Sequence, residues 1–204
     1  MAERRHGLPP PPTTSRFDAA AWADASFSGT RHEAILFAGV DLTDVVEHGA
    51  TFIDCTFRDV RFNASTHTDA AFTNCTFVQC RFFETRFIRC KLVGSMFDRC
   101  TYALLVVEGG AWSLVGMPGA DLRKASLIGA RMREADLTGT RFDKATIRDA
   151  DLSGALLHQA SFHDADLRGS DLSALDPLNV DLRGARIDYE QAAVIAEAMG
   201  LRVG

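Results

Sequence analysis

The 204-residue sequence contains no long apolar run and no excess of basic residues. No stretch approaches the roughly 20 apolar residues that a transmembrane helix needs, and the start, MAERRHGLPPPPTTSRF, lacks the apolar region of a signal peptide. The formal net charge is −5, whereas non-specific binding to nucleic acid or to an anionic membrane requires a basic patch. We therefore expect a cytoplasmic protein that binds neither nucleic acid nor a membrane directly.

The sequence also lacks a phosphate-binding glycine-rich loop, a zinc motif and a nucleophile elbow. Its six histidines are scattered along the chain. The five cysteines share one phase of the repeat described next, which favours a role as small buried residues over metal binding or a disulfide: Cys55, Cys75, Cys80, Cys90 and Cys100. We predict no catalytic residue, no metal site, no cofactor and no enzymatic activity.

The dominant feature of the sequence is a repeat of five residues, which is most regular between Ala120 and Ala174. In each unit of this segment one place, called i below, holds a large apolar residue, and the place i−2 holds Ala, Ser or Thr. The frame runs without a shift from about Ser15 to Ile187 and gives 35 units. Thirteen of the 14 phenylalanines lie at i, the exception being Phe83. Such a repeat predicts units that stack, because one unit cannot bury its own apolar face.

A period of five fits neither regular element by itself. On an α-helix the large residues would lie about 140° apart, and on a straight strand they would alternate between faces. A chain that turns a corner every five residues can point i and i−2 inward and i−1 outward, with i+1 and i+2 in the corner. Glycine supports this geometry, because 11 of the 16 glycines lie at i+2, where a corner with positive φ favours glycine.

The A(D/N)LXX pattern of these units resembles the pentapeptide repeat family. Members of that family coil into a right-handed quadrilateral β-helix with four pentapeptides per coil. The resemblance therefore implies an all-β fold in which residues 20 apart stack on one another. In that frame four phenylalanines are expected to form one column of aromatic rings: Phe37, Phe57, Phe77 and Phe97.

We divide the chain into three parts. Residues 1–14 include four consecutive prolines and are expected to be a disordered tail. Residues 15–187 form the pentapeptide repeat β-helix. Residues 188–204 form a short C-terminal helix and a dimerisation tail.

The C-terminal helix is predicted from its ends. Asp188 and Gln191 can form a capping box, and Gly200 is a good C-terminal stop. One face of this helix is expected to cover the open end of the β-helix and to hide its unpaired edge: Ala192, Ile195, Ala198 and Met199.

Two polar residues, Glu47 and His67, fall at inward places and lie 20 residues apart. One interpretation is that this side of the coil opens to water. A second is a buried pair whose members satisfy each other, and the third is a catalytic dyad.

Residues 101–118, TYALLVVEGGAWSLVGMP, fit the pattern least well. Three of their apolar residues fall at outward places, which indicates either a contact site or an irregular backbone: Leu104, Val106 and Leu114. Pro177 occupies an i place and lacks the N–H that a ladder needs, so its unit is expected to depart from the regular one.

Acidic residues accumulate near the C-terminal end of the repeat. Between Asp149 and Glu190, nine acidic residues accompany three basic ones, a net charge of −6. A rod about as wide as a DNA duplex, with carboxylates at regular intervals, could compete for the basic DNA-binding surface of another protein. The other interpretation is that these carboxylates keep the rod soluble. The candidate partner-binding residues of this acidic face are Asp149, Asp151, Asp164, Asp166, Asp171, Asp176 and Asp181.

Within the pentapeptide repeat family the chain is similar to the actinobacterial MfpA type, which is related to the Qnr quinolone-resistance proteins. The likeness rests on the phenylalanine-rich first half with FTNCTF and KLVGSMF, on ADLRKA, and on the ending GARIDYEQAAVIAEAMGL. It implies a DNA mimic that binds the A subunit of DNA gyrase or a related type II topoisomerase. Such a protein inhibits the enzyme or protects it from topoisomerase poisons such as fluoroquinolones, as antibiotic resistance or self-immunity.

The same resemblance implies a homodimer joined through the C-terminal ends. The expected interface residues are Leu182, Ile187, Val194, Ile195, Ala198, Met199 and Leu201. The alternative function is a structural or protein-interaction scaffold with no role at a topoisomerase, because most of what a repeat encodes is its own folding.

Overall fold

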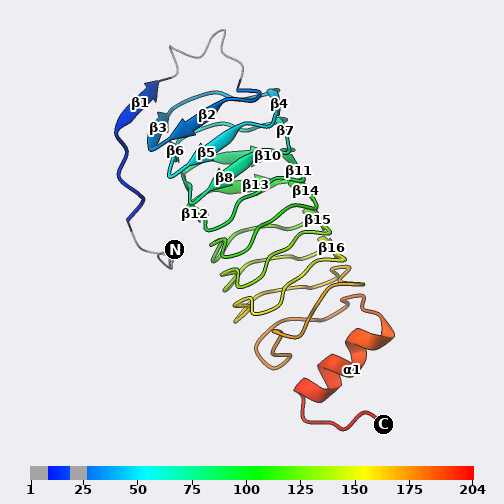
Figure 1. The fold of residues 1–204 in the computed structure, drawn as a ribbon. Coiled ribbons are helices and arrows are strands. Elements are labelled where there is room, and N and C mark those ends of the chain that lie inside the picture. The colour runs from blue at the N-terminus through cyan, green and yellow to red at the C-terminus, as the bar shows by residue number, and fades with distance from the viewer. Residues whose placement is uncertain (1–8, 19–26) are drawn as a thin grey trace.

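The chain forms a four-sided rod of parallel strands that ends in one short helix (Figure 1). The computed structural model describes residues 9–18 and 27–204. Most of the predicted N-terminal tail therefore lies outside the described residues, as does the repeat unit around Trp22. None of the described residues belongs to a helix long and apolar enough to cross a membrane.

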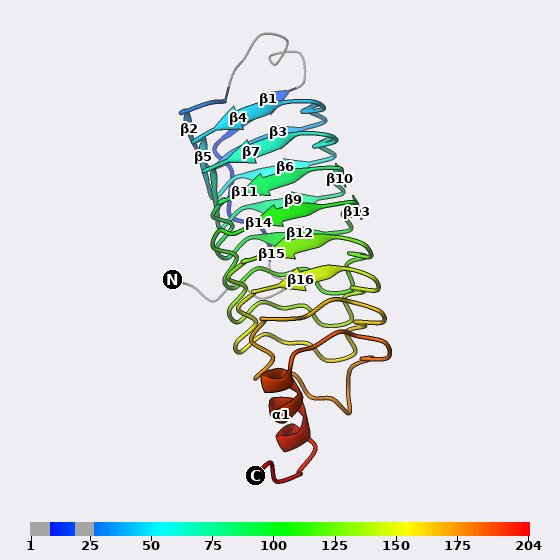
Figure 2. The same ribbon diagram turned by 90° about the vertical axis from the view of Figure 1, so that its right-hand side faces the viewer.

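Four sheets, called sides 1 to 4 in the order in which the chain visits them, make up the rod (Figures 1 and 2). Side 1 consists of β1 (Ser15–Asp18), β3 (Ile35–Ala38), β6 (Thr56–Arg58), β9 (Thr76–Val78) and β12 (Met96–Asp98). Side 2 consists of β10 (Arg81–Phe83) and β13 (Thr101–Ala103). Side 3 consists of β4 (Val46–His48), β7 (Thr66–Thr68), β11 (Arg86–Ile88), β14 (Val106–Glu108), β15 (Ser126–Ile128) and β16 (Thr146–Arg148). Side 4 consists of β2 (Arg31–Glu33), β5 (Thr51–Ile53) and β8 (Ala71–Thr73).

Each strand pairs in parallel with residues exactly one coil away. Phe57 lies opposite Phe77 on side 1, and Leu127 lies opposite Ile147 on side 3. Isolated bridges such as Asp151 with Asp171 continue the same step of 20 residues toward the C-terminal end. Four units of five residues therefore complete each coil, and the predicted right-handed quadrilateral β-helix is confirmed.

The core is filled by the i and i−2 residues, as the repeat predicts. The rings of the predicted phenylalanine column are stacked, with centroid distances of 4.9 Å for Phe37–Phe57, 4.9 Å for Phe57–Phe77 and 4.6 Å for Phe77–Phe97. Four of the cysteines are buried and Cys100 is half-buried, and all five are free thiols. Burial raises the pKa of the Cys90 thiol to about 12, which keeps it protonated.

The corners have positive φ at i+2 in every described unit from Gly29 to Gly169 and again at Gly184, but not at Ala174 and Asn179, which flank Pro177. All 11 glycines predicted for this place have φ between 65° and 77°. In many corners the N–H of i+3 also donates to the carbonyl of i, as in Ala125 to Leu122 at 3.1 Å, which is the hydrogen bond of a β-turn. Where the sequence has no glycine, another residue adopts the same strained conformation: Lys124 has φ +61°.

Replacing Lys124 with glycine is therefore expected to stabilise the protein by about 0.5–1 kcal/mol. A side chain at positive φ destabilises the folded state by about 1–2 kcal/mol, and glycine removes this strain. Glycine also gives the unfolded chain more backbone entropy, which offsets part of the stabilisation. Lys91→Gly is the matched control, because Lys91 is also exposed but lies in an extended bridge between Ala71 and Ala111. Urea unfolding should show the control losing stability, and a loss for Lys124→Gly would contradict the corner geometry.

Residues 101–118 keep the regular strand pairing in the structure, although Gly110 departs from the regular unit with φ +91° at an i−2 place. An irregular backbone therefore does not explain the outward apolar residues Leu104, Val106 and Leu114. β13 and β14 pair in register with β10 and β11, and bridges link Ala111 to Lys91 and to Arg131. The departure predicted at Pro177 does occur. The side 1 ladder, which bridges Asp136 to Leu156, has no further bridge to Asp176 among the described residues.

The C-terminal helix α1 (Tyr189–Ala198) begins with the predicted capping box of Asp188 and Gln191. It ends in a Schellman motif, in which the N–H of Leu201 donates to Ala196 and that of Gly200 to Glu197.

The predicted inner face of α1 is wrong for three of its four residues: Ala192, Ala198 and Met199 are exposed. Gln191 is buried instead, and its amide donates to the carbonyls of Leu167 at 2.6 Å and Ser170 at 2.7 Å. The capping box fixes the helix so that this residue faces the carbonyls of the last coil. A polar side chain therefore satisfies the open edge of the sheet, together with the half-buried Ile195.

Candidate functional site

The seven aspartates predicted to form one acidic face are spread over all four sides of the rod. The side on which each aspartate lies follows from its place in the 20-residue coil. Asp176 lies on side 1, at the unit of Pro177, whereas Asp164 and Asp181 lie on side 2 and Asp166 on side 3. The remaining three gather at the edge between sides 3 and 4 and on side 4: Asp149, Asp151 and Asp171.

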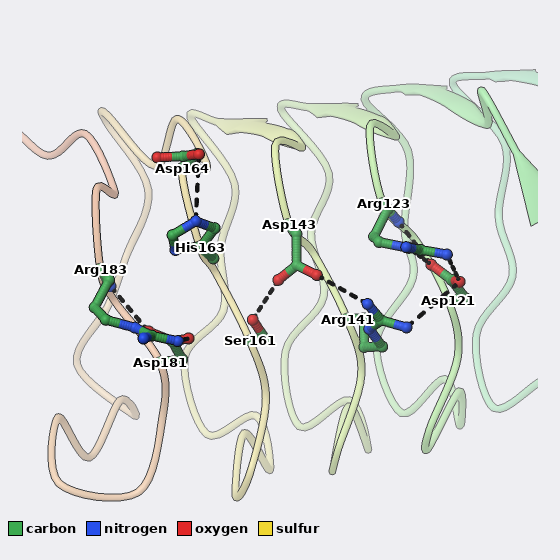
Figure 3. A network of polar contacts seen from close by, with 9 residues as sticks. All are labelled: Asp121, Arg123, Arg141, Asp143, Ser161, His163, Asp164, Asp181 and Arg183. Atoms are coloured by element: carbon green, nitrogen blue, oxygen red, sulfur yellow. Dashed lines mark hydrogen bonds and ion pairs between the residues drawn. The ribbon is translucent and has the colours of Figure 1, made fainter.

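Side 2 carries a ladder of ion pairs rather than a run of negative charge (Figure 3). Arg123 donates two hydrogen bonds to Asp121, at 2.7 and 2.6 Å. Arg183 does the same to Asp181, at 2.9 and 2.6 Å. The figure also shows Arg141 reaching toward Asp143 in its own unit and toward Asp121 on the preceding coil. The charges of this side are largely matched, so it offers little net potential to a basic partner.

The sequence signal behind these pairs is the tripeptide Asp-Leu-Arg. Its Asp is at i−1 and its Arg at i+1, so both point outward on one side with the core leucine between them. It occurs at residues 121–123, 166–168 and 181–183, and in each the arginine binds its aspartate through two nitrogens. The Arg168 guanidinium lowers the pKa of Asp166 to about 2, and Arg183 likewise holds the pKa of Asp181 well below its usual range.

Units that read Asp-Leu-Ser leave their carboxylate without an arginine in the same unit. Asp151 and Asp171 belong to such units and are bridged across one coil on side 4. The carboxylate of Asp149 lies over Gly169, two residues before Asp171. A β-carbon at Gly169 would be only 2.1 Å from Asp149 Oδ1. Asp188 reaches the same place, because its Oδ2 accepts a hydrogen bond from the N–H of Gly169 at 2.9 Å.

These four aspartates, Asp149, Asp151, Asp171 and Asp188, are called the acidic cluster below. Arg133 pairs with Asp151. In the described part of the chain, no basic side chain forms an ion pair with Asp149 or Asp171, and both are exposed. The cluster is therefore the place near the C-terminal end where outward carboxylates are close together and incompletely neutralised. Its fourth member was missed because Asp188 was assigned only to the helix cap.

The residues predicted for a dimer interface divide into two groups. Leu182, Ile187 and Ile195 are half-buried and pack against the core of the rod. The others are exposed at the C-terminal end: Val194, Ala198, Met199 and Leu201. Tyr189 and Val203, in the same C-terminal segment, are exposed too. The end of the rod thus carries an apolar surface next to the acidic cluster.

A second exposed apolar patch lies on side 2. Phe83, the one phenylalanine outside the i phase, is 47% exposed, and Leu104 is 46% exposed. They line a shallow hollow together with Tyr102 and Ala103, and Asp121, Arg123 and Lys124 border it. This patch gives a physical basis to the contact-site interpretation of residues 101–118.

Glu47 and His67 form a buried pair, so the interpretation that this side opens to water is wrong. His67 Nδ1 lies 3.2 Å from Glu47 Oε1, and Glu47 Oε2 accepts the N–H of Ala50 at 3.0 Å. Ser65 Oγ donates to the Phe62 carbonyl at 2.6 Å and lies 3.0 Å from His67 Nε2, from which it accepts. One proton between Nδ1 and Oε1 then satisfies both atoms and leaves the pair neutral overall.

The order Ser65–His67–Glu47 has the hydrogen-bond connectivity of a catalytic triad, but solvent and substrate have no access to it. All three residues are almost completely buried, and Phe72 and Phe87 pack against the imidazole. A substrate therefore cannot reach Ser65, and the arrangement acts as a hydrogen-bonded layer in the core. No group of three or more potential metal ligands occurs among residues 9–18 and 27–204.

The fold defines a class, the β-solenoid built from five-residue units that repeat every 20 residues. Residues 117–154, 135–173 and 160–189 match the family of pentapeptide repeats, with eight copies of the repeat. The same unit continues through the described coils that precede this segment, and the chain belongs to the pentapeptide repeat family. Residues 22–102 also match the family model described as the SV2A/B/C luminal domain.

Solved structures similar to this chain include other pentapeptide repeat proteins. Trypsin-treated QnrB1, a plasmid-mediated fluoroquinolone resistance protein, is 21% identical with a TM-score of 0.46, over 93% of this chain and 96% of that one. HetL, a protein involved in heterocyst differentiation regulation in the cyanobacterium Nostoc, is 18% identical with a TM-score of 0.44, over 82% and 91%. Values this low support no inference about function. No curated protein matches the chain significantly.

Proposed function

We propose that this chain is a non-enzymatic, dimeric DNA mimic that binds the A subunit of DNA gyrase or a related type II topoisomerase in the cytoplasm. By occupying the DNA-binding surface it inhibits the enzyme or protects it from topoisomerase-poisoning antibiotics. The observation that carries the proposal is the acidic cluster at the C-terminal end of a rigid rod, beside an exposed apolar surface. The sequence likeness to the MfpA and Qnr type supports it.

The spacing of the carboxylates supports binding to a surface made for DNA. Asp151 and Asp171 occupy successive coils, which are about 4.8 Å apart in a β-structure. DNA presents one phosphate per ~3.4 Å on each strand. A basic groove that accepts regularly spaced phosphates can therefore accept carboxylates repeated at a comparable interval, with attraction that salt weakens.

A two-fold dimer would bring two acidic clusters to the middle of the particle. The exposed apolar residues of the C-terminal end include Met199 and Leu201, which are 55% and 61% exposed. A two-fold interface is self-complementary, so one apolar surface serves both protomers. The charge of the two clusters would then lie around the particle's own axis, where it can face the symmetric DNA-binding surface of a dimeric topoisomerase.

The variant Met199→Glu/Leu201→Glu is expected to be monomeric. It places two charges in the proposed interface but leaves the capping box and the Gln191 contacts to the last coil intact. Leu178→Glu is the control, because Leu178 is highly exposed on side 1 and outside α1. Sedimentation should give a dimer for the parent and the control. A double variant that stays dimeric would place the interface elsewhere.

The second candidate is a protein-interaction scaffold without a topoisomerase role. The side 2 patch of Phe83 and Leu104 favours it, since exposed apolar residues bordered by charged ones fit a protein partner. Titrating the purified protein into a gyrase supercoiling assay, with and without a fluoroquinolone, separates the two candidates. A DNA mimic changes supercoiling or drug-induced cleavage in a concentration-dependent way, and a scaffold changes neither.

A further inference from the structure

One side of the rod has buried side chains at places that should face solvent. Among the described residues of sides 2, 3 and 4, every residue at i−1 is exposed or half-buried. On side 1, by contrast, Thr56 is 3% exposed, Thr76 6% and Met96 7%, and Gly116 in the next coil is buried too. These four residues occupy the same place in successive coils and form a continuous strip, called the side 1 strip below.

The N-terminal segment is placed to cover this strip. β1 pairs with β3 on side 1, and the N–H of Thr14 donates to the carbonyl of Ala34 at 2.7 Å. From that point residues 9–14 run along the rod on the side of β3, β6 and β12, on its left in Figure 1 and behind it in Figure 2. Pro11 is half-buried, whereas the other residues of this segment are exposed.

The segment is long enough to reach the strip from Thr56 to Met96. A polyproline II chain rises about 3.1 Å per residue, so the five steps from Thr14 to Pro9 span about 16 Å. Coils of a β-helix are about 4.8 Å apart, so 16 Å is about three coils. The three coils that follow Ala34 along side 1 contain Thr56, Thr76 and Met96, which are the strip's three residues with side chains.

The chemistry of the strip suits a proline-rich chain. The strip carries no charged residue at i−1. The Met96 side chain lies along the rod, and its sulfur is 2.3 Å from the place where a β-carbon of residue 116 would be if Gly116 had one. Methionine adapts to irregular apolar partners such as proline rings. Thr56 Oγ1 is buried without a hydrogen-bond partner and can donate to a carbonyl. A polyproline II chain has free carbonyls, since it makes no internal hydrogen bonds.

We propose that the side 1 strip is a binding site for an extended proline-rich peptide, and that residues 9–14 occupy it as a displaceable ligand carried by the chain itself. An external proline-rich segment then competes with the chain's own segment for the strip. This site is independent of the acidic cluster, which lies at the other end of the rod.

The test uses the full-length chain with Pro9, Pro10, Pro11 and Pro12 all replaced by serine, so that its own segment releases the strip. The probe is a fluorescein-labelled peptide with the unchanged sequence of residues 1–14, and binding is measured by fluorescence anisotropy. We expect the peptide to bind the serine variant at least ten-fold more tightly than the parent, because a tethered segment competes at a high effective concentration. Circular dichroism and thermal melting establish that the variant is folded.

Two further variants locate the binding site. Met96→Arg, added to the serine variant, should abolish peptide binding, since it puts a long charged side chain in the strip. Val106→Arg is the matched control, because Val106 is an apolar i−1 residue on side 3 and should leave binding unchanged. Equal affinity for parent and serine variant, no binding to either, or binding that survives Met96→Arg would each overturn the proposal.

Discussion

Phe77→Ala is expected to lower the free energy of unfolding by about 3–5 kcal/mol, the range found for buried phenylalanines. Phe77 has no exposed surface and is stacked between Phe57 and Phe97 in the centre of the side 1 column. Removing its ring leaves a cavity that coils fixed by backbone ladders above and below cannot close. Urea unfolding followed by circular dichroism measures the loss.

Phe83→Ala is the matched control for this prediction. Phe83 lies six residues after Phe77, in the next unit, but points outward and is 47% exposed. Its loss is expected to stay below about 1 kcal/mol, as for other surface substitutions. If Phe77→Ala also cost less than about 1 kcal/mol, the inward phase of the repeat would be wrong at that unit.

Glu47→Leu is expected to destabilise the protein by about 3–5 kcal/mol, as breaking a buried pair by removing one partner does. His67 Nδ1 would lose its one partner inside the core, where water cannot replace it. The double variant Glu47→Leu/His67→Phe removes both members of the pair and extends the aromatic packing toward Phe87.

The double variant should recover all but about 1–2 kcal/mol of that loss. The remaining loss arises because the N–H of Ala50 no longer has its acceptor, Glu47 Oε2. A double-mutant cycle with His67→Phe alone gives the coupling between the two residues. Additive losses would mean that Glu47 and His67 do not interact in the folded protein.

Much of the fold follows from the period of five, because each place in the unit has one physical task. Large residues at i and small ones at i−2 fill the core, and glycine at i+2 tolerates the positive φ of the corner. The capping box of α1 is equally local, since Asp188 and Gln191 satisfy each other's backbone groups. Features decided within one unit or one helical turn can therefore be predicted from the sequence.

The candidate site was less predictable because it depends on the period of 20 rather than 5. Asp151 and Asp181 occupy the same place in their units but point from opposite sides of the rod. Whether an aspartate is neutralised within its own unit depends on the residue at i+1, which is Arg183 for Asp181 but Ser153 for Asp151. Asp151 pairs instead with Arg133 of the preceding coil. The inner face of α1 was also mispredicted, because the open carbonyls of the last coil prefer the amide of Gln191 to an apolar side chain.

The measurement that tests the proposed function most directly is inhibition of gyrase supercoiling by two matched triple variants. Asp149→Asn/Asp151→Asn/Asp171→Asn changes three members of the acidic cluster. Asp164→Asn/Asp166→Asn/Asp181→Asn changes the net charge by the same amount on sides 2 and 3, where Asp166 and Asp181 are already paired with arginine. All six residues point outward, so both variants should remain folded. We expect the first variant to need a several-fold higher concentration than the parent for half-inhibition, the second to remain close to the parent, and added salt to weaken the parent. Equal inhibition by the parent and the first variant at low salt, or no effect of the parent on supercoiling or on fluoroquinolone-induced cleavage, would contradict the account.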